Sequence, residues 1–103
     1  MPIIDEIRAS AAKQILYLPH AVRQMSRPDR MITPAEIEAV IATGEAIEDY
    51  PDDPRGHSTL LLGRGDGARP IHVLCSPKSD YLAIITSYLP DPARWSDDYR
   101  SRR

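Results

Sequence analysis

The chain has 103 residues, 42% of them hydrophobic, which is enough for one packed domain over residues 1–103 and too few for a second core. The formal net charge of −2 argues against a protein that attracts nucleic acid through its overall field. A single cysteine excludes an internal disulfide and a thiolate metal site. With no membrane-length apolar run and no signal-peptide pattern, we expect a cytoplasmic protein without membrane contact. The three histidines have no close metal-ligand spacing, and we expect no metal and no cofactor.

The first third of the chain is predicted to be helical. Apolar side chains recur on one stripe at helical spacing over residues 3–15. Leu18 precedes a proline and is therefore expected to be extended, which separates this helix from a short second one over residues 20–26.

The strongest helix signal covers residues 33–44. Thr33 can cap the helix, and Glu36 three residues later completes a capping box. Ile32 and Ile37 are positioned for a hydrophobic staple across this helix start. Gly44 is expected to end the helix in a left-handed conformation.

The remaining chain has the pattern of a sheet. The Asp66-Gly67 pair predicts a hairpin turn, and short connections elsewhere predict an antiparallel meander. Four strands are expected, over residues 45–50, 58–64, 69–76 and 81–88. The predicted fold is therefore α+β, with two or three N-terminal helices packed on one face of a four-stranded antiparallel β-meander. The last two strands are apolar on both faces and should be central.

Two histidines are candidates for acid–base chemistry, because the pKa of histidine lies near neutrality. His20 opens the second helix, where its alternative role is a hydrogen bond to a neighbouring carbonyl. His72 alternates with Ile71 and Val73 in the third strand, so it should face the side of the sheet away from the helices. Its alternative role is that of a partly exposed cross-strand residue.

Arginines and an aromatic side chain could bind negative charge beside these histidines. Arg23 and Arg30 lie near His20, and Arg69 precedes the third strand. A strand-end arginine such as Arg69 can hold phosphate, although such side chains are usually solvated. Tyr88, near the end of the fourth strand, could stack a base or bond a phosphate of a substrate.

Several segments in order resemble one known family. They are His20-Ala21 followed by Met25, Arg30-x-Ile32-Thr33 entering a helix, and residues 48–53, 60–63, 69–73, 85–88 and 90–92, the last followed by Trp95.

This series resembles the bacterial and archaeal domain of unknown function 4258. It divides the chain into an N-terminal helix at residues 1–19, a family core at 20–95 and a C-terminal tail at 96–103, with Trp95 as the anchor of that tail. The family is similar to RelE/ParE-type toxins, which are compact sheets with two N-terminal helices, many of which cleave messenger RNA. Gln24 departs from the family pattern, which carries arginine at this position.

Two function classes follow. The first is a non-enzymatic binding module, such as a toxin–antitoxin-related protein with an antitoxin-like partner, which the acidic total and Gln24 favour. The second is a RelE-like ribonuclease acting on RNA by general acid–base catalysis, which the family resemblance favours. In the second class Tyr88 would bind substrate, and the catalytic residues would be His20, Arg23, Arg30, Arg69 and His72.

Overall fold

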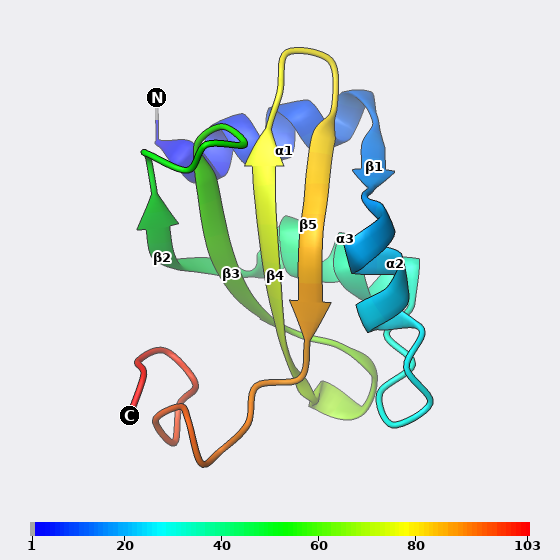
Figure 1. The fold of residues 1–103 in the computed structure, drawn as a ribbon, viewed down its shortest axis with the longest axis vertical. Coiled ribbons are helices and arrows are strands. Elements are labelled where there is room, and N and C mark those ends of the chain that lie inside the picture. The colour runs from blue at the N-terminus through cyan, green and yellow to red at the C-terminus, as the bar shows by residue number, and fades with distance from the viewer. Residues whose placement is uncertain (1) are drawn as a thin grey trace.

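The computed structural model describes residues 2–103 and shows a twisted five-stranded sheet with helices against it (Figure 1). The helices are α1 (Ile3–Lys13), α2 (Pro19–Met25) and α3 (Pro34–Thr43). The strands are β1 (Ile15–Tyr17), β2 (Glu45–Tyr50), β3 (Ser58–Arg64), β4 (Pro70–Pro77) and β5 (Leu82–Tyr88). The α+β class is confirmed. None of the helices in the described residues is long and apolar enough to cross a membrane.

The prediction of four antiparallel strands is wrong, because the sheet has five strands in the order β1-β5-β4-β3-β2 and is mixed. β1 pairs in parallel with β5, placing Ile15 opposite Leu82 and Tyr17 opposite Ile84. The expected first helix ends two residues early, at Lys13, and the chain then continues as this strand. A strand of three residues is too short to show a two-residue hydrophobic period, which explains why the pattern did not reveal it.

The start of α3 forms as predicted. Thr33 Oγ1 accepts a hydrogen bond from the Glu36 backbone N–H at 3.2 Å, and Glu36 Oε1 accepts one from the Thr33 N–H at 3.1 Å. The predicted left-handed end is wrong, because Gly44 has φ −76° and ψ 177°. Glycine is required there for space instead, since a Cβ would lie 2.7 Å from the Leu62 carbonyl oxygen and closer still to that of Val40.

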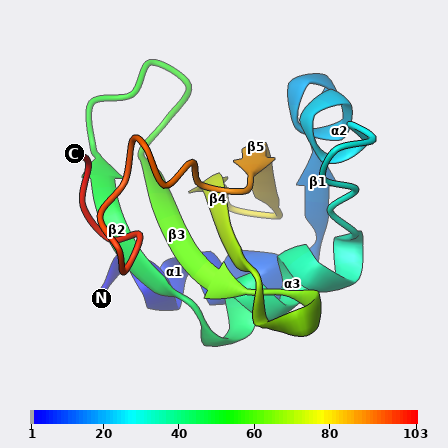
Figure 2. The ribbon, with the colours of Figure 1, turned by 90° about the horizontal axis from the view of Figure 1, so that it is seen from below.

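The main core lies between the sheet and helices α1 and α3, which cover one face, while α2 packs along β5 beyond the end of β1 (Figure 2). Its fully buried side chains come from helices and inner strands alike, and include Ile7, Ile37, Val40, Leu61, Ile71, Val73, Leu82 and Ile84. Cys75 lies in this core, as its alternation with Val73 predicts. Strands β4 and β5 are interior, which confirms that the last two predicted strands are central.

The hairpin turn between β3 and β4 forms at the predicted position. It contains a short 3₁₀ turn, η1 (Asp66–Ala68), in which Gly67 has a φ of +64°. Glycine adopts this left-handed conformation without steric cost, so Asp66-Gly67 supplies the turn that the sequence indicates.

The other sheet face is partly covered by the C-terminal tail, residues 89–103, which runs from β5 across to β2 (Figure 2). Trp95 is only 3% exposed and anchors the tail, as the sequence predicts. Arg100 pairs with Glu45 at 2.5 Å, and Arg102 pairs with Glu48 at 2.9 Å, so two tail arginines bind the acidic edge strand. The sheet face opposite α1 and α3, which the sequence predicted to be uncovered, is therefore covered by the tail at one end.

Candidate ligand-binding clefts

Two neighbouring cavities open on the sheet face away from α1 and α3. The smaller, of about 420 Å³, lies between α2, the end of β5 and the tail, and we call it the arginine cleft. Its lining includes three arginines, which come from the α2–α3 loop and the tail. The lining residues are His20, Gln24, Arg30, Thr86, Tyr88, Leu89, Asp91, Arg94, Trp95 and Arg102.

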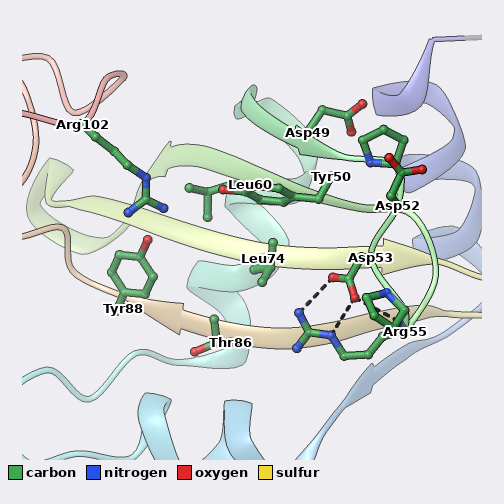
Figure 3. A pocket seen from close by; sticks show the side chains of 12 residues that line it. Asp49, Tyr50, Asp52, Asp53, Arg55, Leu60, Leu74, Thr86, Tyr88 and Arg102 are labelled. Atoms are coloured by element: carbon green, nitrogen blue, oxygen red, sulfur yellow. Dashed lines mark hydrogen bonds and ion pairs between the residues drawn. The ribbon is translucent and has the colours of Figure 1, made fainter.

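The larger cavity, of about 680 Å³, lies over the middle of the sheet, and we call it the sheet cleft (Figure 3). Leu60, Leu74 and Thr86 form its floor, and the loop of residues 51–57 bounds it opposite the tail. Its wall toward the tail contains Tyr88 and Arg102. Because Thr86, Tyr88 and Arg102 line both cavities, the two clefts lie side by side, and we call the pair the trough.

His72 lies beneath the wall that separates the two clefts and is completely buried. The alternative that His72 is a partly exposed cross-strand residue is wrong, because Trp95 packs edge-on against it at 4.4 Å between ring centroids. Its Nε2 lies 3.0 Å from the Tyr99 carbonyl oxygen, which can only accept, so Nε2 carries the proton. Burial lowers the pKa of His72 below its ordinary value, so the ring is neutral and its Nδ1 accepts from the Tyr88 hydroxyl at 3.2 Å.

This hydrogen bond orients the Tyr88 side chain at the junction of the clefts. Burial raises the pKa of Tyr88 above its ordinary value, so the hydroxyl keeps its proton at neutral pH. With that proton directed at His72, the lone pairs of the Tyr88 oxygen are available to accept from a donor in either cleft.

Arg69 does not face either cleft. Its guanidinium donates to both oxygens of Glu36, at 2.9 and 2.7 Å, and to the carbonyl oxygens of Arg30 and Met31 at 2.7 and 3.2 Å. Glu36 is 2% exposed and also accepts from the Asp66 backbone N–H at 2.9 Å. The hydrogen bonds from Arg69, with smaller contributions from two backbone N–H groups, lower the pKa of Glu36 to about 2. These contacts join the start of α3 to the β3–β4 turn, so Arg69 has a structural role.

The cations of the arginine cleft differ in how strongly the protein already binds them. Arg102 is held by both carboxylate oxygens of Glu48, at 2.9 and 3.0 Å, and this hydrogen bonding lowers the pKa of Glu48. Arg30 makes only long contacts, 3.5 Å to Gln24 and 3.9 Å to Asp29. Arg94 is exposed, and no side-chain acceptor in residues 2–103 forms an ion pair with it. Arg94 is thus the cation most available to a ligand. Arg30 also lacks a close ionic partner, and its side chain is 13% exposed.

The acidic loop beside the sheet cleft is largely neutralised within the protein. Asp53 accepts from Arg55 at 2.9 Å and from Ser58 at 2.7 Å, and these bonds lower its pKa. Asp49 lies 2.6 Å from a ring nitrogen of His57, and its pKa is also lowered. Within residues 2–103, no group of three or more histidine, cysteine, aspartate or glutamate side chains is arranged to hold a metal ion.

The structure brings together half of the residues singled out from the sequence. His20, Arg30 and Tyr88 line the arginine cleft, whereas Arg23 is exposed on α2 outside its lining. Sequence reasoning missed Arg94 and Arg102. The available signal was the position of these arginines on either side of Trp95, which the sequence did identify as an anchor.

The fold and the trough define a small α+β domain with its cavities on the sheet face opposite the helical layer. Residues 17–88 match the family model described as a domain of unknown function (DUF4258), and the chain belongs to that family. No curated protein and no solved structure matches the chain. The matched residues run from the end of β1 to the end of β5, so helix α1 and the tail that supplies Arg94 and Arg102 lie outside them.

Proposed function

We propose that this domain is a non-enzymatic binding module whose site is the arginine cleft and whose ligand is an anionic segment of a macromolecular partner. The observation that carries the proposal is that Arg30, Arg94 and Arg102 line one cleft together with Tyr88 and His20. An antitoxin-like protein, as in toxin–antitoxin-related systems, is one partner of this kind.

The charge balance of the cleft supports an anionic ligand. The charge of Arg102 is already neutralised by Glu48. The lining of the cleft contains one acidic residue, Asp91, and one oxygen of its carboxylate accepts a hydrogen bond from the Ala93 N–H. The two positive charges of Arg30 and Arg94 thus exceed the single negative charge of Asp91, so a ligand carboxylate or phosphate would gain charge-assisted hydrogen bonds there. The lone pairs of Tyr88 can accept from a backbone N–H beside the anionic group of the ligand, and the amide N–H₂ of Gln24 can donate to that group.

The state of His72 supports binding in preference to catalysis. A general base or acid must reach the proton that it transfers, at about 2.6–3.2 Å or through one water. Both ring nitrogens of His72 are engaged, by Tyr88 and Tyr99, and the ring is shielded by Trp95. A mechanism shared between His20 and His72 would therefore require the tail to leave the sheet face.

The test uses the single tryptophan, Trp95, which lines the arginine cleft and reports on binding by its fluorescence. Poly-L-glutamate and poly(U) are titrated separately at low ionic strength, where charge-assisted binding is strongest. We expect at least one to bind, and we expect Arg94→Gln to weaken that binding about tenfold, as loss of one charged hydrogen bond predicts. Arg23→Gln, which removes an equal charge outside the cleft, is the matched control. Failure of both polymers to bind, or equal loss in both variants, would refute the proposal.

The second candidate is the RelE-like ribonuclease, which one observation favours: His20, Arg30 and Tyr88 lie in the same cleft. In this case His20 would act as the base, and Tyr88, whose raised pKa keeps its proton, would act as the acid after its hydroxyl turns from His72 toward the substrate. Expression without a partner should then arrest growth, and purified protein should cleave RNA with a loss of roughly 100-fold in rate for His20→Ala. Growth without arrest and RNA left intact would exclude this candidate.

A further inference from the structure

The trough contains a feature that a simple anion site does not need, namely an apolar floor beside its cationic end. Leu60 and Leu74 lie at the centre of the sheet cleft, between the aromatic side chains of Tyr50 and Tyr88 (Figure 3). Tyr50 is 37% exposed, which is high for a large aromatic side chain next to a cavity. At about 680 Å³, the sheet cleft can hold a large apolar side chain together with a short stretch of backbone.

The two ends of the trough have different charges. The arginine cleft offers Arg30 and Arg94. The sheet cleft is bordered by Asp49, Asp52 and Asp53, and the two arginines in its lining, Arg55 and Arg102, are already paired with Asp53 and Glu48, so among the described residues it offers no unpaired cation to a phosphate. A single nucleic-acid strand carries a phosphate on every nucleotide, so a strand along the trough would place phosphates beside these carboxylates. A peptide can carry acidic groups at one end only. The charge pattern therefore favours a peptide over RNA.

We infer that the trough binds an extended segment of a partner protein in which a large apolar side chain stands next to acidic residues. The apolar side chain would occupy the sheet cleft on Leu60 and Leu74, with Tyr50 at its side. The acidic side chains would reach Arg30 and Arg94 in the arginine cleft. This inference rests on the proposed function and adds to it the chemical class of the ligand.

Arg102 and Tyr88 stand where the two halves of such a segment meet. The Arg102 guanidinium lies 4.6 Å from the centre of the Trp95 ring and is bound to Glu48, so its position is set before a ligand arrives. The Tyr88 side chain is likewise oriented by His72. Groups fixed in advance lose little conformational freedom on binding, so they would select the spacing between the apolar and the acidic side chains.

A phage-displayed library of random linear peptides, selected on the immobilised full chain, tests the inference. We expect enriched peptides to combine aspartate or glutamate with a nearby leucine, phenylalanine or tryptophan. Binding of one enriched peptide, measured by fluorescence anisotropy, should weaken about tenfold in Tyr50→Ala and in Arg94→Gln. Arg23→Gln should bind it as the wild type does. Tyr50 and Arg94 are exposed, so these variants should fold, which circular dichroism can verify.

Three results would overturn the inference: no enriched sequence, enrichment of basic or purely polar peptides, or peptide affinity unchanged in Tyr50→Ala. Oligouridylate bound more tightly than every selected peptide would also overturn it and would identify RNA as the ligand. In that last case the arginine cleft would still be a binding site, so the failure of the peptide inference is distinguishable from the failure of the proposed function.

Discussion

Glu36 provides the sharpest prediction on stability, because its carboxylate joins three parts of the fold. It accepts hydrogen bonds from the Thr33 N–H, from the Asp66 N–H and from Arg69, while being 2% exposed. Its pKa falls from the ordinary 4.5 to about 2. At about 1.4 kcal/mol per pKa unit, this difference corresponds to about 3 kcal/mol of folding free energy that depends on the charge of Glu36.

The variant Glu36→Gln keeps the size of the side chain and removes its charge. It leaves the Arg69 guanidinium, 30% exposed, without its counter-ion. We expect a loss of about 3 kcal/mol, near the lower end of the 3–5 kcal/mol that breaking a buried ion pair costs. For a domain of this size, with a urea m-value of about 1.5 kcal/mol/M, the unfolding midpoint should fall by about 2 M.

Urea unfolding followed by Trp95 fluorescence and by circular dichroism measures this change, with Glu38→Gln as control. Glu38 lies on the same helix but is exposed, so its substitution should stay within about 0.5 kcal/mol. The pKa of Glu36 is lower in the folded chain than in the unfolded chain, so its contribution to the free energy of unfolding is lost as pH falls, here between about pH 5 and about pH 2. Glu36→Gln should remove that part of the acid dependence. Equal midpoints for the two variants would refute the reasoning.

Three further predictions concern the core and the buried histidine. Gly63→Ala should cost about 1–3 kcal/mol in urea unfolding, because its Cβ would lie 2.9 Å from the Val40 Cα. The Cys75 thiol, whose pKa burial raises to about 12, should react with a thiol reagent only after denaturation; rapid reaction of the native protein would contradict its burial. Because burial lowers the pKa of His72 from its ordinary 6.5, the unfolded chain takes up a proton first and stability should fall as pH drops through about 6.5. His72→Gln should flatten that dependence in thermal unfolding across this pH range, and an unchanged slope would contradict a neutral His72.

The elements that the sequence predicts correctly depend on short-range signals. The Thr33–Glu36 capping box involves residues three apart, and the Asp66-Gly67 turn involves adjacent ones, so a single stretch of chain contains the whole signal. Strand β1 forms only by pairing with β5, and its residue Ile15 lies opposite Leu82, which is 67 positions later in the chain. No local pattern of three residues can specify such a partner.

The candidate site likewise contains residues that short-range signals can identify and residues that only long-range contacts bring together. His20 and Arg30 are close in sequence, and both reach the arginine cleft, whereas Arg94 and Arg102 reach it only because the tail folds back over the sheet. Alternation placed His72 on the correct face of β4. Its burial depends on Trp95 arriving from 23 residues further along the chain, and strand alternation contains no information about that contact.

The measurement that tests the central claim most directly compares two double variants of equal charge change. Arg30→Gln/Arg94→Gln removes two cations from the arginine cleft, and Arg23→Gln/Arg27→Gln removes two exposed cations near α2 that do not line it. Affinity for an anionic probe, poly-L-glutamate or poly(U), is measured at matched ionic strength for both. If the cleft is the binding site, the first variant loses about 100-fold in affinity and the second changes little. Equal losses would mean that the probe responds to overall charge, which would contradict a binding site in the arginine cleft.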